Sequence, residues 1–227
     1  MSESAVALAI ALGVVGAAWG LLADRIAARW PEHEAEVDEA GAVVRPAGWV
    51  RKVDWRTVVV LVLGALSLGA LPLRFAEPVS LAIFGTLFAA LTLLLATDLD
   101  QRLLPDVVTL PAIPIALGIG LLGLNPLVPP SALPGAILAA LVIPAFLFVV
   151  AIPFGAGAIG IGDLKLLVSV GLLVGLARAV AGIVVGALAA GAVLAVLLLA
   201  RRITLRTYVP FGPFLIVGAY WAVLVAL

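Results

Sequence analysis

Only four carboxylates follow residue 97, and the two clusters that contain them could perform acid–base chemistry. The first cluster reads TDLDQRLLPD over residues 97–106, and the second reads GIGDLK over residues 160–165. No charged residue lies between Asp106 and Asp163. Because an ionisable side chain in an apolar environment is costly, such residues are functional by default. The two clusters are therefore the first candidates for a site.

Asp98 and Asp163 are the candidate catalytic pair. On the topology derived below, both lie at the same face of a helical bundle, where they could approach one another. Two carboxylates that lie close together share one proton, because both cannot ionise cheaply. One of them can then activate water as a general base, while the other, protonated, polarises a peptide carbonyl. An aspartyl protease requires this arrangement.

Asp100, Gly160, Gly162 and Lys165 are candidates for substrate binding or auxiliary roles. The two glycines leave room for a substrate strand to approach the backbone. Asp100 is two residues from Asp98 and points away from it on a helix, so it is auxiliary or solvating. Lys165 is also explained as a positively charged membrane anchor. Asp163, taken alone, also fits a helix cap.

The elements that must position these residues are apolar helices. Of the 227 residues, 65% are hydrophobic and 11% are charged, whereas a soluble domain has about 25% charged residues. The composition excludes a soluble enzyme, a nucleic-acid-binding protein and a disordered chain. It predicts an all-α, polytopic membrane helix bundle with about eight transmembrane helices, because each span takes ~20 apolar residues. The apolar runs cover residues 4–23, 57–73, 77–97, 107–124, 131–153, 164–177, 179–200 and 208–227.

The distribution of basic residues predicts the orientation in the membrane. With the N-terminus outside, only Arg74 and Arg178 lie in outer segments, and the other eleven of the 13 Lys and Arg residues lie inside. Cytoplasmic loops carry an excess of Lys and Arg. We therefore expect both termini outside and both acidic clusters on the cytoplasmic side of the inner membrane.

Three segments follow from this scheme: a first transmembrane helix over 1–23, a short cytoplasmic loop over 24–56, and a membrane domain of about seven helices over 57–227. The end of the loop, residues 49–56, alternates aromatic and basic residues and predicts an interfacial anchor. The chain has no cysteine, and its only histidine, His33, lies in the loop. Thiolate metal sites and a Cys nucleophile are therefore excluded, and we predict neither a metal nor a cofactor.

The motifs resemble those of the type IV prepilin peptidases, which are membrane aspartyl proteases of the GxGD class. The resemblance rests on three motifs. The first is GxGDxKLL around Asp163, and the second is an aspartate, Asp98, seven residues before the proline of Leu104-Pro105-Asp106. The third is VPFGPF over residues 209–214. It covers most of the chain from about residue 80 onward. A fainter likeness to the family's first loop lies in residues 18–31.

The resemblance implies that Asp98 and Asp163 are the catalytic aspartates. It implies cleavage of prepilin-like precursors between a basic leader and a hydrophobic N-terminal helix, at the cytoplasmic membrane face. Many bacterial relatives also methylate the new N-terminus and carry a CxxC zinc-binding insert in the first cytoplasmic loop. That loop lacks cysteine here, so we predict a minimal peptidase without this metal site and without methyltransferase activity.

Two other functions fit parts of the sequence. A proton-coupled transporter or channel could use the same carboxylates as a relay, although such sites are expected near mid-membrane and in two related halves. A catalytically inactive relative retained for assembly is a further alternative, against which the presence of both aspartates argues. Presenilin-like peptidases share GxGD, but their Tyr-Asp partner motif is missing here.

Overall fold

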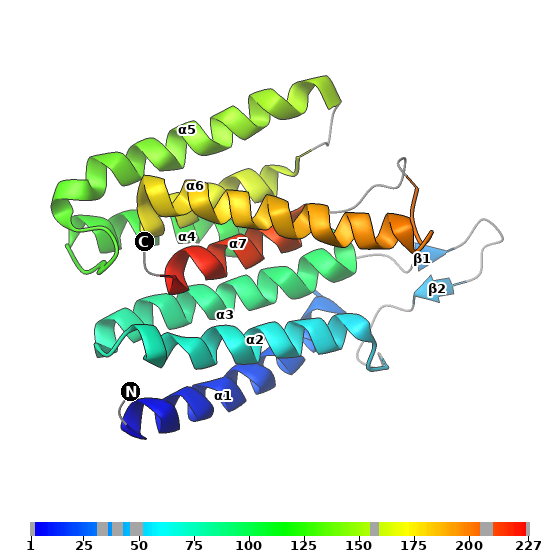
Figure 1. The fold of residues 1–227 in the computed structure, drawn as a ribbon, viewed down its shortest axis with the longest axis horizontal. Coiled ribbons are helices and arrows are strands. Elements are labelled where there is room, and N and C mark those ends of the chain that lie inside the picture. The colour runs from blue at the N-terminus through cyan, green and yellow to red at the C-terminus, as the bar shows by residue number, and fades with distance from the viewer. Residues whose placement is uncertain are drawn as a thin grey trace. The chain divides into compact units, whose positions relative to one another are not determined.

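The computed structural model is helical and describes residues 3–30, 36–37, 43–45, 52–154, 159–204 and 211–225. Figure 1 shows the elements in chain order. The α-helices are α1 (Glu3–Ala27), α2 (Trp55–Arg74), α3 (Pro78–Gln101), α4 (Asp106–Leu121), α5 (Leu133–Ala151), α6 (Ile161–Leu199) and α7 (Gly212–Leu224). Short 3-10 helices precede and follow α5, at Pro130–Ala132 and Ile152–Phe154. The all-α class is confirmed.

The chain divides into two compact units. Unit 1 contains residues 1–73 and 85–105, and unit 2 contains residues 74–84 and 106–227. Unit 1 is therefore formed by α1, α2 and most of α3, and unit 2 by α4 to α7. The division passes through the first cluster: residues 97–105, with Asp98 and Asp100, belong to unit 1, whereas Asp106 belongs to unit 2 together with the second cluster.

In unit 1, glycines let α1 and α2 pack closely. A Cβ on Gly20 would lie 2.7 Å from the carbonyl oxygen of Val60, and one on Gly64 would lie 2.5 Å from that of Gly16. In a membrane the hydrophobic effect does not drive helices together, and small residues let them approach closely enough for van der Waals packing to do so. The α1 helix is also tied to α3, because the indole of Trp19 donates to the carbonyl of Ala89 at 2.8 Å.

In unit 2, α6 is the central element and packs against α4, α5 and α7. A Cβ on Gly171 would lie 3.1 Å from the backbone of Ala140 in α5. Further along α6, one on Gly186 would lie 2.5 Å from the carbonyl oxygen of Phe214 in α7. Different stretches of α6 therefore contact different partners.

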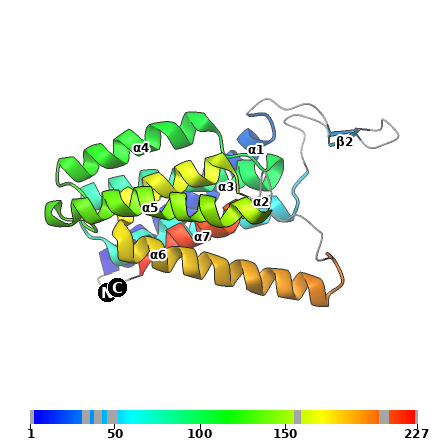
Figure 2. The same ribbon diagram turned by 90° about the horizontal axis from the view of Figure 1, so that it is seen from above.

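The α6 helix is a hairpin of two arms rather than one straight rod. Gly175 has φ 75° and ψ 172°, which are not helical angles. Figures 1 and 2 show that α6 reverses its direction within its length. Side chains of both arms, including Leu166 and Ile183, line one apolar groove with α5 and α7. At the break, the carbonyl of Leu173 accepts a hydrogen bond of 2.8 Å from the amide of Asn125, which replaces the lost helical donor.

Replacing Gly175 with alanine is expected to lower the free energy of unfolding by about 1–3 kcal/mol, because only glycine adopts this backbone conformation without strain. The midpoint of thermal unfolding in detergent measures the effect. Gly135→Ala is the matched control, because a Cβ on Gly135 meets nothing within 4 Å. Equal midpoints for the two variants would contradict the strained turn.

Five of the described helical segments are long and apolar enough to cross a membrane: α1, α2, α3, α5 with its preceding 3-10 turn, and α6. The α4 and α7 helices are apolar but shorter. Many large apolar side chains, such as Ile10, Phe146 and Leu199, are exposed, as expected where a helix faces lipid. The chain is thus a multi-pass membrane protein, and the number of eight spans stays a prediction.

Several predicted boundaries are wrong by a few residues. The α1 helix continues beyond residue 23 to Ala27, and α3 continues beyond residue 97 to Gln101. The predicted runs 164–177 and 179–200 are the two arms of α6, with the break at Gly175. In the predicted loop 24–56, Glu36–Val37 and Val43–Arg45 pair as a short antiparallel hairpin. His33, Val209 and Pro210 lie outside the described residues.

Candidate active site

Asp98 lies in the last turn of α3, in unit 1. The side chain is buried, with 3% of its surface exposed, and its neighbours in sequence, Ala96 and Thr97, are buried too. The backbone carbonyl of Asp98 accepts a hydrogen bond of 2.9 Å from the N–H of Arg102. Arg102 has a φ of 55°, so the helix ends there in a left-handed residue, as helices commonly do. The backbone of Asp98 thus takes part in the last hydrogen bond at the C-terminal end of α3.

Asp100, in the same turn, is engaged by an arginine of α2. Its Oδ1 atom accepts a hydrogen bond of 2.8 Å from the Arg56 guanidinium, and its side chain is only 9% exposed. Of the two roles expected for Asp100, auxiliary or solvating, this contact favours the auxiliary one. The physical reason is that Arg56 supplies a charge partner that sequence spacing within α3 cannot reveal.

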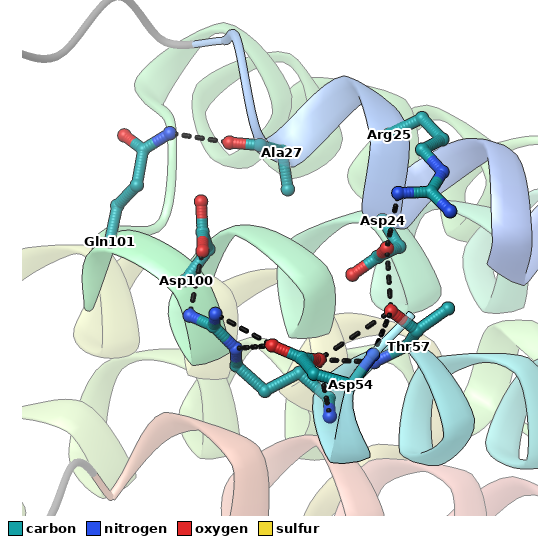
Figure 3. A network of polar contacts seen from close by, with 8 residues as sticks. Asp24, Arg25, Ala27, Asp54, Thr57, Asp100 and Gln101 are labelled. Carbon is teal, nitrogen blue, oxygen red and sulfur yellow. Dashed lines mark hydrogen bonds and ion pairs between the residues drawn. The ribbon is translucent and has the colours of Figure 1, made fainter. Parts of the chain in front are cut away.

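A polar network surrounds this ion pair at one end of unit 1 (Figure 3). The guanidinium of Arg56 also binds Asp54, with its Nε 3.0 Å and one terminal nitrogen 2.8 Å from the same carboxylate oxygen. The hydroxyl of Thr57 donates to buried Asp24 at 2.9 Å. The amide of Gln101 donates to the carbonyl of Ala27 at 2.6 Å. The ends of α1, α2 and α3 are thus joined by side-chain hydrogen bonds.

Asp163 lies in the first turn of α6, in unit 2, and is 7% exposed. The N-cap of α6 is Gly160 and Asp163 is the third residue of the helix, a position from which a carboxylate can cap the backbone of the N-cap residue. The backbone of Gly160 hydrogen-bonds to the carboxylate. Among the described residues, the Oδ1 atom of Asp163 is buried and has no hydrogen-bond partner. A buried oxygen in this state is available to a substrate or a water molecule.

Gly160 keeps space free beside this carboxylate. A Cβ at residue 160 would lie 3.1 Å from Oδ2 of Asp163, which is tighter than an ordinary van der Waals contact. The other motif glycine, Gly162, is partly buried within the first turn of α6. The glycine-rich approach to Asp163 therefore has a local steric reason at residue 160.

Lys165 forms an ion pair with Asp106, with 2.6 Å between Nζ and Oδ1. Asp106 is the first residue of α4, where an acidic side chain interacts favourably with the helix dipole. The pair joins the beginnings of α4 and α6 within unit 2. Lys165 is thus engaged with a neighbouring helix, next to the candidate Asp163.

The structure brings together Arg56 with Asp100 in unit 1 and Lys165 with Asp106 in unit 2. Asp98 and Asp163 belong to different units, and their convergence stays a prediction. Among the residues that the structure describes, no group of three or more His, Cys, Asp or Glu side chains could hold a metal ion.

Sequence reasoning missed Asp24, Asp54, Arg56 and Thr57. Arg56 belongs to the predicted interfacial anchor, and its side chain is 13% exposed and pairs with two carboxylates that the prediction did not include. A signal was present: an Asp three residues before a Thr, at the start of an apolar run, is a variant of the capping box. In the structure, Asp54 accepts the N–H of Arg56 at 2.9 Å and that of Thr57 at 3.2 Å.

The fold and these residues define a multi-pass helical membrane protein with acidic side chains at helix ends. Residues 85–199, which include both candidate aspartates, match the type IV leader peptidase family. The chain therefore belongs to the type IV leader peptidase family.

Two relatives named prepilin leader peptidase/N-methyltransferase, from Burkholderia pseudomallei strains 1026b and K96243, are each 36% identical to the chain over 155 residues. The alignments cover 68% of this chain and 50% of each relative. The chain thus spans about half the length of these curated relatives. No solved structure matches it.

Proposed function

We propose that the protein is an aspartyl endopeptidase that removes the leader peptide of type IV prepilin-like precursors. The observation that carries this proposal is the family match over residues 85–199, which contains Asp98 and Asp163 in one peptidase domain. The name of the two Burkholderia relatives supports prepilin-like proteins as the substrate class. Family membership also favours the peptidase over the transporter that the sequence left open.

The proposed catalytic pair is Asp98 and Asp163. Both side chains are buried at helix ends, and the open Oδ1 atom of Asp163 fits a group that must bind water or a peptide carbonyl. In the proposed reaction, one carboxylate removes a proton from water as the water oxygen adds to the scissile carbonyl carbon. The protonated partner stabilises the developing oxyanion. The C–N bond then breaks, and the leaving nitrogen takes a proton from the pair.

The auxiliary residues take roles that follow from their contacts. We propose that Gly160 preserves the space into which the scissile peptide enters, because a side chain there would crowd Asp163. Gly162 lies between Gly160 and the aspartate and belongs to the same glycine-rich approach. Lys165, fixed by Asp106, sets the position of the first turn of α6. Asp100, paired with Arg56, connects the last turn of α3 to α2.

The proposed setting is the cytoplasmic face of the inner membrane, with both chain termini outside. It is supported by the excess of Lys and Arg in the segments that this orientation places inside. Precursors enter from that side, and their hydrophobic helix lies in the bilayer. The leader then reaches the membrane surface at which the acidic clusters are expected.

Purified full-length chain is expected to cut a type IV prepilin into a short leader and a mature protein, read by intact-mass spectrometry. Detergent extract from membranes that lack the chain is the control. We also propose that the chain has peptidase activity alone, since it lacks the cysteines of the zinc-binding insert. The mature product should therefore carry an unmethylated N-terminus when S-adenosylmethionine is supplied.

Two outcomes separate the alternatives. An uncut precursor, together with proton flux into liposomes that contain the chain, would replace the peptidase with the transporter. A product heavier by one methyl group would retain the peptidase and overturn the prediction of a minimal form.

A further inference from the structure

The Arg56 network lies within unit 1, and the chemistry proposed above makes no use of its central residue. The network consists of Asp24, Asp54, Arg56, Thr57 and Asp100, with contacts of 2.8–3.5 Å between side chains (Figure 3). It connects α1 and the start of α2 to the last turn of α3. That turn also carries Asp98.

We propose that Arg56 is a positioning residue for Asp98 and acts through Asp100. The inference rests on the proposed function, because it presumes that Asp98 takes part in peptide hydrolysis. Arg56 does not belong to the motifs that define the catalytic clusters. Its role would be to fix the turn from which Asp98 reaches its reacting partner.

The last turn of α3 needs such a partner for electrostatic reasons. The C-terminal end of a helix carries a partial negative charge, so acidic side chains there are unfavourable. Asp98 and Asp100 both lie in this turn; Asp98 is buried and Asp100 is partly buried, with 9% of its side chain exposed. The guanidinium of Arg56 compensates the charge of Asp100 directly, at 2.8 Å. Without the guanidinium, the partial negative charge of the helix end would act on the Asp100 carboxylate as well as on that of buried Asp98.

The geometry requires an arginine rather than any cation. One terminal nitrogen of Arg56 binds Asp100, while Nε and the other terminal nitrogen bind Asp54. The planar guanidinium thereby joins two carboxylates that come from different parts of the chain. A lysine carries its charge at a single atom and lacks this fixed fork.

The Asp54 side of the network is anchored in turn. Asp54 accepts the backbone N–H groups of Arg56 and Thr57, as an N-cap residue does. The Thr57 hydroxyl donates to buried Asp24 of α1. Arg56 therefore extends from a rigid helix start that is tied to α1, and transmits that position to α3. A displacement of about 1 Å at a catalytic group can lower a rate about 10²-fold.

The test compares the kcat and KM of purified full-length variants acting on a prepilin-like precursor. Arg56→Gln and Asp100→Asn are each expected to lower kcat about 10- to 100-fold with little change in KM. The double variant should lose no more than either single variant, because both changes break one connection. Arg56→Lys should recover part of the loss. Arg202→Gln removes an exposed arginine and should keep the kcat of the unmodified chain.

The outcomes distinguish this inference from the proposed function. If the unmodified chain does not cut the precursor, the proposed function fails. If it does, and Arg56→Gln retains the kcat of Arg202→Gln, only the positioning role is overturned. Additive losses in the double variant would also overturn it, because Arg56 would then act independently of Asp100. Each rate is normalised to folded protein, and Asp100→Asn carries the test if Arg56→Gln does not accumulate.

Discussion

Asp98→Asn and Asp163→Asn are each expected to abolish precursor processing, with a loss of at least about 10²–10⁴-fold in kcat. An amide has nearly the shape of a carboxylate, but it can neither remove a proton from water nor carry the shared proton. The two carboxylates are proposed to function together in one reaction. The double variant is therefore expected to be no slower than either single variant, as for other catalytic residues that function together.

Processing is measured with purified variants in detergent, after equal accumulation in membranes has been established. Glu77→Gln is the matched control, because Glu77 is an exposed acid on the side predicted to face outward. It should retain the activity of the unmodified chain. Full activity in either aspartate variant would remove that residue from the proposed pair, and full activity in both would remove the aspartyl mechanism.

The helical class and most of the helices could be predicted because a bilayer imposes lengths and apolar composition on the segments that cross it. The runs 57–73 and 107–124 correspond to α2 and α4, which the structure bounds at Trp55–Arg74 and Asp106–Leu121. Proline did not prevent this agreement, although α2 and α4 both contain it. Composition therefore carries most of the information about the elements of this chain.

Helix ends were harder to predict, because a charge was taken as the end of an apolar run. The α1 helix continues through Asp24, whose side chain is 2% exposed, and α3 continues through Asp98 and Asp100. Asp24 and Asp100 are accommodated by partners from α2, namely Thr57 and Arg56. Such a partner is a tertiary contact, and no pattern within one helix contains it.

The hairpin of α6 is a second feature that could not be predicted from the sequence. The run 164–177 is shorter than the ~20 residues of a transmembrane span, and the structure joins it to the following run through the turn at Gly175. A glycine with positive φ looks like any other glycine in the sequence. The partner of the turn, Asn125, lies 48 residues before the carbonyl that it binds. Its role follows from packing in unit 2.

The candidate site was predictable to the extent that motifs carry it. Asp98, Asp163 and Gly160 were identified from spacing, and the structure supplies a steric reason for Gly160. Arg56 was assigned to the membrane interface because it follows aromatic and basic residues. Its two carboxylate partners show that a positive charge near a predicted interface can also belong to a partly buried network.

Replacing Gly182 or Gly218 with valine is expected to destabilise unit 2 by about 1–3 kcal/mol or more. The two glycines face one another where the second arm of α6 crosses α7. A Cβ on Gly182 would lie 2.7 Å from the carbonyl oxygen of Gly218 and 3.0 Å from the Cβ of Ala222. The first neighbour is backbone, so the helices must separate to admit a side chain. The small apolar contacts on both sides of the crossing are then lost.

Gly191, on the same arm of α6, supplies the matched control with the opposite sign. A Cβ there meets nothing within 4 Å, so alanine adds no clash and removes the conformational freedom of glycine, which destabilises a helix interior by about 0.5–1 kcal/mol. Gly191→Ala should therefore raise the midpoint of thermal unfolding in detergent, whereas Gly182→Val and Gly218→Val should lower it. The distance from the added Cβ to the nearest backbone atom decides whether the substitution raises or lowers the midpoint of unfolding. Midpoints that fell equally for all three variants would show that the crossing of α6 and α7 is not the close contact described.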